Sequence, residues 1–173
     1  NIWNAHEHCR FVIDNYGFET LQERDSTYNL YEKIEDYFND THNYLKYLKF
    51  GYGRVTDHAS MDIRFQRLTR EQGIEYIKKY EYQKKPKNLQ LFLDFMEITE
   101  QEFEDSVEHL RDPDAWEKDS KGQWHETDWV GNHVDDEGVE NARLPIVKPY
   151  DDLKSPKYSS TRDGSHEDDM ISL

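Results

Sequence analysis

Apolar side chains recur every three or four positions through most of the chain before Pro113, a spacing that places them on one face of an α-helix. The clearest stripe predicts a long helix from near Tyr31 to Phe50. Its members are Ile34, Phe38, Thr41, Leu45 and Leu48. Further helices are expected over about residues 3–16 and 57–67 and from near residues 69, 86 and 99. The pattern therefore predicts a mainly α fold.

Residue types that begin and end helices support these assignments. Thr69 with Gln72 and Thr99 with Glu102 have the spacing of capping boxes, in which each side chain bonds to the backbone of the other residue. Gly17 follows the first predicted helix, at a position where glycine commonly ends a helix. We therefore expect several short, individually capped helices.

The pattern changes after residue 120. Residues 121–130, around Trp124 and Trp129, are compatible with a short β element. From Gly131 onward, glycine, proline, serine and acidic residues dominate, and such segments lack the apolar area needed for a core. The sequence therefore predicts a helical region over residues 1–130 and a disordered acidic and polar tail over residues 131–173.

Composition limits the class of protein. The 173 residues have a mean hydropathy of −1.11, yet 14% are aromatic, which predicts a modest core rich in tyrosine. No apolar run approaches the roughly 20 residues that cross a membrane. Because the chain begins at Asn1, shows no leader and has Cys9 as its single cysteine, we expect a fragment of a cytoplasmic protein.

Charge is distributed unevenly along the chain. Residues 99–141 hold fifteen acidic and three basic residues, a net charge of −12, whereas residues 42–90 hold eleven basic and five acidic residues, a net charge of +6. The overall charge of −15 disfavours nucleic acid as a partner. The basic segment suits a small phosphorylated ligand, but the two segments could equally neutralise each other in the fold.

The basic segment contains a regular stripe. His42, Lys46 and Lys49 follow one another at i, i+4 and i+7, so they project from one face of the predicted second helix. This stripe runs beside the apolar face, at the edge of the core. On spacing alone, a solvated helix edge is the favoured interpretation, and a group of catalytic cations is the alternative.

Two glycines and another cation follow directly. Gly51 and Gly53 let the backbone approach a ligand closely, and Arg54 places a positive charge on the far side of the turn. Cations on both sides of such a turn suit a phosphate or a carboxylate. An ordinary glycine stop after a helix explains the same residues.

Weaker patterns lie nearby. Asp57, Ser60 and Arg64 share a face of the third predicted helix, where they could hold a substrate or form surface ion pairs worth less than about 1 kcal/mol. Three further groups resemble a metal site, a catalytic triad and a stacking platform, but each is explained more simply by structural roles. They are His6 to Cys9, then His58 with Ser60 and Asp62, and Trp116 with Trp124 and Trp129. We therefore predict no metal site.

These residues belong to an ordered series of short motifs. The series is His42-x3-Lys46-x2-Lys49-Phe50-Gly51-Tyr52-Gly53-Arg54, Asp57, Ala59-Ser60, Ile63-Arg64, Leu68-Thr69-Arg70-Glu71, Gly73, Lys79-Tyr80, Thr99-x2-Glu102-Phe103, and Arg111-Asp112-Pro113 with Trp116 and Trp124. Over about residues 3–129 it resembles the N-acetyl sugar amidotransferases of bacterial surface-polysaccharide and flagellin-sugar synthesis. Gln66-Arg67 departs from the resemblance, because many members have Asn-Gly there.

The resemblance implies a parent fold. The family is similar to ATP pyrophosphatases of the adenine-nucleotide hydrolase type, whose N-terminal α/β domain carries a Ser-Gly-Gly-x-Asp-Ser phosphate loop. That loop is absent from this chain. The chain is therefore expected to be the helical C-terminal portion of such an enzyme, with ATP and Mg²⁺ bound mainly by an N-terminal half that it lacks.

The resemblance also implies a reaction and residue roles. ATP would activate the N-acetyl group of a nucleotide-linked sugar, and ammonia from a partner glutaminase would then convert that group to an acetamidino group. Lys46, Lys49 and Arg54 would face phosphate or a sugar carboxylate, and His42 would relay a proton. The residues expected to bind or orient substrate are Gly51, Gly53, Asp57, Ser60 and Arg64.

Two other interpretations remain open. The chain could be a non-catalytic helical interaction module whose acidic segment 99–141 binds a basic partner. It could also be the helical domain of another phosphate-loop ATP pyrophosphatase.

Overall fold

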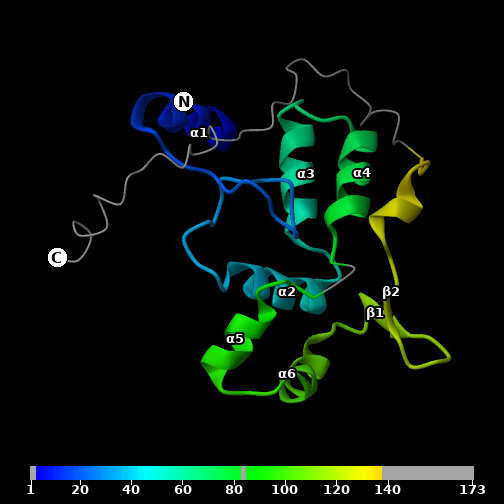
Figure 1. The fold of residues 1–173 in the computed structure, drawn as a ribbon. Coiled ribbons are helices and arrows are strands. Elements are labelled where there is room, and N and C mark those ends of the chain that lie inside the picture. The colour runs from blue at the N-terminus through cyan, green and yellow to red at the C-terminus, as the bar shows by residue number, and fades with distance from the viewer. Residues whose placement is uncertain (1–2, 83–84, 138–173) are drawn as a thin grey trace.

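The computed structural model describes residues 3–82 and 85–137 and is mainly helical (Figure 1). The α-helices are α1 Ala5–Tyr16, α2 Asn39–Phe50, α3 Arg54–Arg64, α4 Arg70–Tyr80, α5 Leu89–Met96 and α6 Glu100–Val107. Two 3₁₀ turns, η1 Glu108–Leu110 and η2 Val130–His133, and a two-stranded sheet complete the described elements. None of the described helices is long and apolar enough to cross a membrane.

The helices pack around two apolar clusters. α3 and α4 lie side by side (Figure 1), and Val55, Ala59 and Ile77 are buried between them together with Tyr28 and Leu68. A second cluster joins α2 to α5, α6 and the first strand. Its buried members are Tyr44, Tyr47, Leu48, Leu89, Leu93, Phe103, Val107 and Trp116. The tyrosine-rich core expected from composition is therefore present in both clusters.

The helix ends follow the local chemistry read from the sequence. Both capping boxes form, with Thr69 and Thr99 accepting bonds from the backbone N–H groups of Gln72 and Glu102. Gly17 ends α1 in the left-handed conformation, with φ of 67°. These predictions are therefore confirmed. They succeeded because each depends only on residues within about one helical turn.

The predicted start of the second helix is wrong. α2 begins at Asn39, and residues 31–38 are irregular. The Asn29 side chain accepts bonds from the N–H groups of Tyr31 and Glu32, and the Asp36 carboxylate accepts one from Phe38. Such short-range side-chain bonds take the place of helical ones. The apolar stripe therefore continues through a segment that is not helical.

The bounds of the third helix also differ from those expected. α3 runs from Arg54 to Arg64 rather than from Asp57 to Arg67, and Gly53 is its N-cap. At its end, Gln66 has a left-handed backbone with φ of 58°, which stops the helix. This is the position at which many members of the resembled family have Asn.

Replacing Gln66 with Asn should therefore raise the stability of the chain. Asn tolerates left-handed backbone better than Gln does, so we expect a gain of about 0.5 kcal/mol in the free energy of unfolding. Urea denaturation of the two proteins measures it. Gln90→Asn, at the exposed second position of α5, is the matched control and should be neutral or slightly destabilising, since Gln90 also donates a bond to Asp94. An unchanged or lower stability of Gln66→Asn would contradict the expectation.

The β element is a hairpin, of which the sequence indicated one arm. β1 Trp116–Lys118 pairs antiparallel with β2 Trp124–Glu126, and Trp116 lies opposite Glu126. Trp129, which was expected in the same arm, lies beyond β2 and precedes η2. Arg70 of α4 donates bonds to the carbonyl groups of His133 and Val134, within the segment predicted as the start of the tail. The rest of that predicted tail, residues 138–173, lies outside the described residues.

Candidate functional site

The turn between α2 and α3 brings together three of the side chains expected at the site. Lys46 Nζ lies 2.5 Å from Asp57 Oδ2, and Arg54 Nη1 lies 3.3 Å from the same oxygen. These side chains are between 21% and 31% exposed. Two cations therefore share one carboxylate at the edge of the core.

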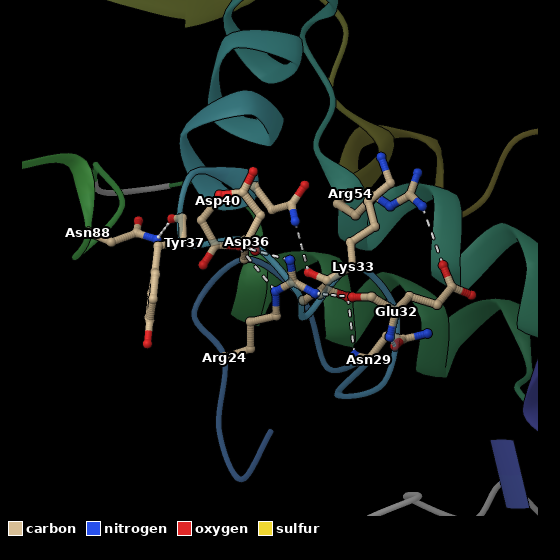
Figure 2. A network of polar contacts seen from close by, with 12 residues as sticks. Arg24, Asn29, Glu32, Lys33, Asp36, Tyr37, Asp40, Arg54 and Asn88 are labelled. Atoms are coloured by element: carbon tan, nitrogen blue, oxygen red, sulfur yellow. Dashed lines mark hydrogen bonds and ion pairs between the residues drawn. The ribbon is translucent and has the colours of Figure 1, made fainter. Parts of the chain in front are cut away.

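The irregular segment before α2 supplies a second carboxylate. Glu32 Oε2 accepts a bond from Arg54 Nη2 at 3.3 Å, which Figure 2 shows, and lies 3.2 Å from His58 Nε2. The His58 imidazole lowers the pKa of Glu32 most, although burial opposes the shift. Sequence analysis missed Glu32 because the predicted helix placed it on a regular surface turn.

A buried hydroxyl extends the chain of contacts inward. Thr27 Oγ1 lies 2.7 Å from His58 Nδ1, and both residues are buried. Thr27 Oγ1 also accepts the backbone N–H of Asn29, so its own O–H can donate to the imidazole. We call these six residues, Lys46, Asp57, Arg54, Glu32, His58 and Thr27, the Arg54 network.

The loop that carries Glu32 is itself fixed by polar contacts. Arg24 donates to the Glu32 carbonyl at 2.7 Å and to Asp40 Oδ1 from two of its nitrogens (Figure 2). Ser26 donates to the same Asp40 oxygen. The loop is therefore tied to the first turn of α2, which holds Glu32 in position beside α3.

The Arg54 network is close to electrically balanced. Lys46 and Arg54 contribute two positive charges, and Asp57 and Glu32 contribute two negative ones. An incoming phosphate would have to compete with these carboxylates for the cations. The network therefore suits positioning and proton transfer, and it binds an anion strongly only if a carboxylate moves away.

The other expected site residues lie outside the network. His42, Lys49, Ser60 and Arg64 are exposed. Lys49 Nζ lies 5.0 Å from the centre of the Phe50 ring, and among the described residues Lys49 forms no ion pair. The stripe of three basic residues on α2 thus divides, with Lys46 bonded to Asp57 and the other two facing outward.

Both glycines of the turn are required by close contacts. Gly51 ends α2 with φ of 74°, and a Cβ there would lie 3.2 Å from the Cβ of Ala115. At Gly53 a Cβ would lie 2.1 Å from Glu81 Oε1. The sequence left open whether these glycines let a ligand approach or simply end the helix. In the structure they let the backbone of the turn approach Ala115 and Glu81 of the same chain.

Glu81 is the second residue that sequence analysis missed. It follows α4, is 8% exposed, and accepts a bond from Thr56 Oγ1 at 2.9 Å on Oε2. Oε1 lies against Gly53, and no described residue donates it a hydrogen bond of standard geometry. Burial raises the pKa of this carboxyl to about 7, and the Thr56 hydroxyl and the Gly53 N–H oppose the shift. Such perturbed carboxyls are common at functional sites. No sequence pattern marks this glutamate.

A cavity of about 340 Å³ lies beside Glu81. It opens between the end of α2, the first turn of α3 and the segment after β2. Its lining residues are Phe50, Gly51, Tyr52, Thr56, Glu81, Asp114, Ala115, Asp128, Trp129 and Val130. We call it the Trp129 cavity. The cations of the Arg54 network do not line it.

The residues of the triad-like pattern do not come together. His58 and Asp62 are buried with other partners, whereas Ser60 is exposed, so the three do not form a triad. His6 and Cys9 are buried in α1, and no cluster of three potential metal ligands exists within residues 3–82 and 85–137.

The basic and acidic segments meet at Lys85, which bonds Glu100 at 2.5 Å and Glu104 at 2.7 Å.

Comparison with models of known protein families assigns this chain to one of them. The model of the LPS biosynthesis protein WbpG-like family, C-terminal domain, matches residues 23–130. The chain belongs to this family. The WbpG-like match contains the Arg54 network, Glu81 and Trp129, and it begins after α1. It connects the chain with lipopolysaccharide biosynthesis and agrees with the resemblance seen in the motifs. No curated protein sequence matches the chain.

Proposed function

We propose that this chain is the helical C-terminal part of an ATP-dependent amidotransferase of lipopolysaccharide synthesis. The substrate is a nucleotide-activated sugar whose N-acetyl group becomes an acetamidino group. The observation that carries this proposal is the WbpG-like match over residues 23–130, because it includes the whole motif series from His42 to Arg64. Ammonia from a glutaminase partner supplies the nitrogen.

The reaction requires activation because an amide carbonyl is a poor electrophile. The amide oxygen attacks the α-phosphorus of ATP and displaces pyrophosphate. Ammonia then adds to the amide carbon, a base takes one of its protons, and AMP leaves with the former amide oxygen. The product is a cationic amidine. Negative charge builds at the phosphates throughout, so fixed positive groups lower the barrier.

The described residues do not form a cradle for a triphosphate. Lys46 and Arg54 are each paired with a carboxylate, and the turn glycines contact Ala115 and Glu81 rather than open space. We therefore propose that ATP with Mg²⁺ binds mainly to an N-terminal part of the enzyme. In this proposal the Arg54 network faces that part and orients the sugar nucleotide, with Arg54 near the diphosphate.

Activity of Arg54→Ala in the full-length enzyme tests this function. We expect turnover to fall about 100-fold, because the substitution removes the cation that joins Glu32 to Asp57. Mass spectrometry of the sugar nucleotide, supplied with ATP and ammonium, detects the exchange of oxygen for an NH group. Lys49→Ala in the same assay tests whether the exposed lysine also meets phosphate.

Arg10→Ala is the matched control, since Arg10 lies in α1, outside the family match. It should react at the normal rate. Normal turnover by Arg54→Ala would show that the Arg54 network is not part of the active site. Absence of amidine from the native full-length enzyme with every N-acetyl sugar nucleotide supplied would favour a non-catalytic helical module instead.

A further inference from the structure

The lining of the Trp129 cavity has a distinct chemistry. None of its described lining residues is basic, whereas three carry carboxyl groups, namely Glu81, Asp114 and Asp128. Aromatic side chains of Phe50, Tyr52 and Trp129 supply the apolar wall. A lining that combines aromatic faces with hydrogen-bond acceptors and excludes cations disfavours phosphate. It suits a ligand with many hydroxyl donors and apolar C–H faces.

One carboxyl oxygen in this lining is poorly satisfied. Glu81 Oε1 is buried against Gly53, whose N–H acts on the carboxyl without forming a hydrogen bond of standard geometry, whereas Oε2 is bonded to Thr56. A buried polar atom that lacks a good hydrogen bond destabilises the fold. Glu81 also lines the cavity, so its carboxyl can accept a hydrogen bond from a bound hydroxyl or N–H group.

The aromatic wall is also fixed in place. A Cβ at Gly131 would lie 2.1 Å from the Trp129 ring, so the glycine lets the indole lie directly over the backbone. Asp128, the residue before Trp129, is bonded to His133 in the following turn. The indole is therefore held by the short turn after β2, as a binding platform requires.

The cavity adjoins the Arg54 network through Tyr52. Lys46 Nζ lies 4.3 Å from the centre of the Tyr52 ring, and Tyr52 lines the cavity. Thr56, which bonds Glu81, is next in sequence to Asp57 of the network. An acceptor-rich aromatic cavity thus lies next to a pair of cations.

We infer that the Trp129 cavity binds the pyranose ring of the sugar, with a ring face against Trp129 and with sugar hydroxyl or amide N–H groups donating to the carboxyl groups of Glu81, Asp114 and Asp128. The identity of this ring as part of a nucleotide sugar rests on the proposed function. The attached diphosphate then extends past Tyr52 towards Lys46. A small cation such as ammonium would satisfy the carboxylates but leave most of the volume and the aromatic wall unused.

Binding of a simple glycoside to this chain tests the inference without ATP or ammonia. The probe is the methyl glycoside of N-acetylglucosamine, titrated into ¹⁵N-labelled protein while the amide signals of Gly51, Gly53 and Val130 are followed by NMR. We expect saturable shifts of these signals and weak affinity, since the probe lacks the nucleotide. Trp129→Ala and Glu81→Gln should each weaken binding about tenfold or more.

Two matched controls separate the cavity from general effects. Trp3→Ala removes an exposed tryptophan of the N-terminal region, and Glu75→Gln changes an exposed glutamate of α4. Both should bind the glycoside as the native chain does. The dispersion of the NMR spectrum reports whether each variant is folded. If a cavity variant does not fold, Asp114→Asn, at the exposed rim of the cavity, is used in its place.

Each outcome decides the question. Loss of binding in the cavity variants with normal binding in the controls supports the inference. Absence of shifts at these amides, equal binding by all variants, or shifts with ammonium chloride but not with the glycoside would overturn it. Glycoside binding without amidine formation by the full-length enzyme would contradict the proposed function alone. Normal turnover by Trp129→Ala would contradict the sugar site alone.

Discussion

Replacing Arg67 with Ala should lower the free energy of unfolding by about 3–5 kcal/mol. Arg67 is 5% exposed, and its guanidinium donates to Asp62 Oδ1 at 2.8 Å and to Asn4 Oδ1 at 3.1 Å. Asp62 is also buried, and its other oxygen accepts the Tyr28 hydroxyl at 2.8 Å. Removing the cation leaves a buried carboxylate without its opposite charge, which is costly at a site shielded from water. Urea denaturation measures the effect.

Arg64→Ala is the control for this experiment. Arg64 is exposed at the end of α3, the helix that also carries Asp62, so its replacement should change the stability by less than about 0.5 kcal/mol. Because Arg67 also bonds Asn4, the N-cap of α1, the Arg67 variant should in addition lose helical circular dichroism before the main transition. Equal stability of the two variants would show that the buried pair is not a major determinant of the fold.

Glu81→Gln should make the stability of the chain less dependent on pH. Burial raises the pKa of Glu81 to about 7 from the ordinary value of 4.5, so the folded state holds this proton at pH values where the unfolded state has released it. The native protein therefore loses stability as pH rises through the window from 4.5 to 7, and the variant does not. The difference in stability between them should grow in favour of the variant by roughly 3 kcal/mol.

Urea denaturation of both proteins at pH 5 and pH 8 measures this difference. The comparison cancels the titration of the groups that do not interact with Glu81. Glu75→Gln, an exposed glutamate on α4, is the matched control and should follow the native protein at both pH values. A constant difference between Glu81→Gln and the native protein would show that Glu81 is already ionised well below pH 7.

The accuracy of the sequence-based predictions followed the range of the interactions involved. The capping boxes at Thr69 and Thr99 formed as expected, because both partners of each bond lie within four residues. The start of α2 was placed eight residues too early, because apolar periodicity continued while Asn29 and Asp36 bonded the backbone in non-helical turns. Periodicity reports which side chains face the core, but it does not report where the backbone bonds go.

The features of the candidate site also differ in how far the sequence could predict them. The sequence alone placed Lys46 and Arg54 on either side of a glycine turn, and its ordered motifs identified the family that the match over residues 23–130 confirms. Its local patterns also determined a mainly helical chain with tyrosine in the core. All of this follows from contacts between near neighbours and from motif order along the chain.

Only the tertiary structure decided which charges meet. Glu32 lies 22 residues from Arg54, and Glu81 lies 25 residues from Thr56, so no local spacing could pair them. The fold turned Lys46 inward to Asp57, left Lys49 exposed, and enclosed Glu81 where burial raises its pKa. Burial and long-range pairing set the charge state of a side chain, and both arise only when distant segments pack together.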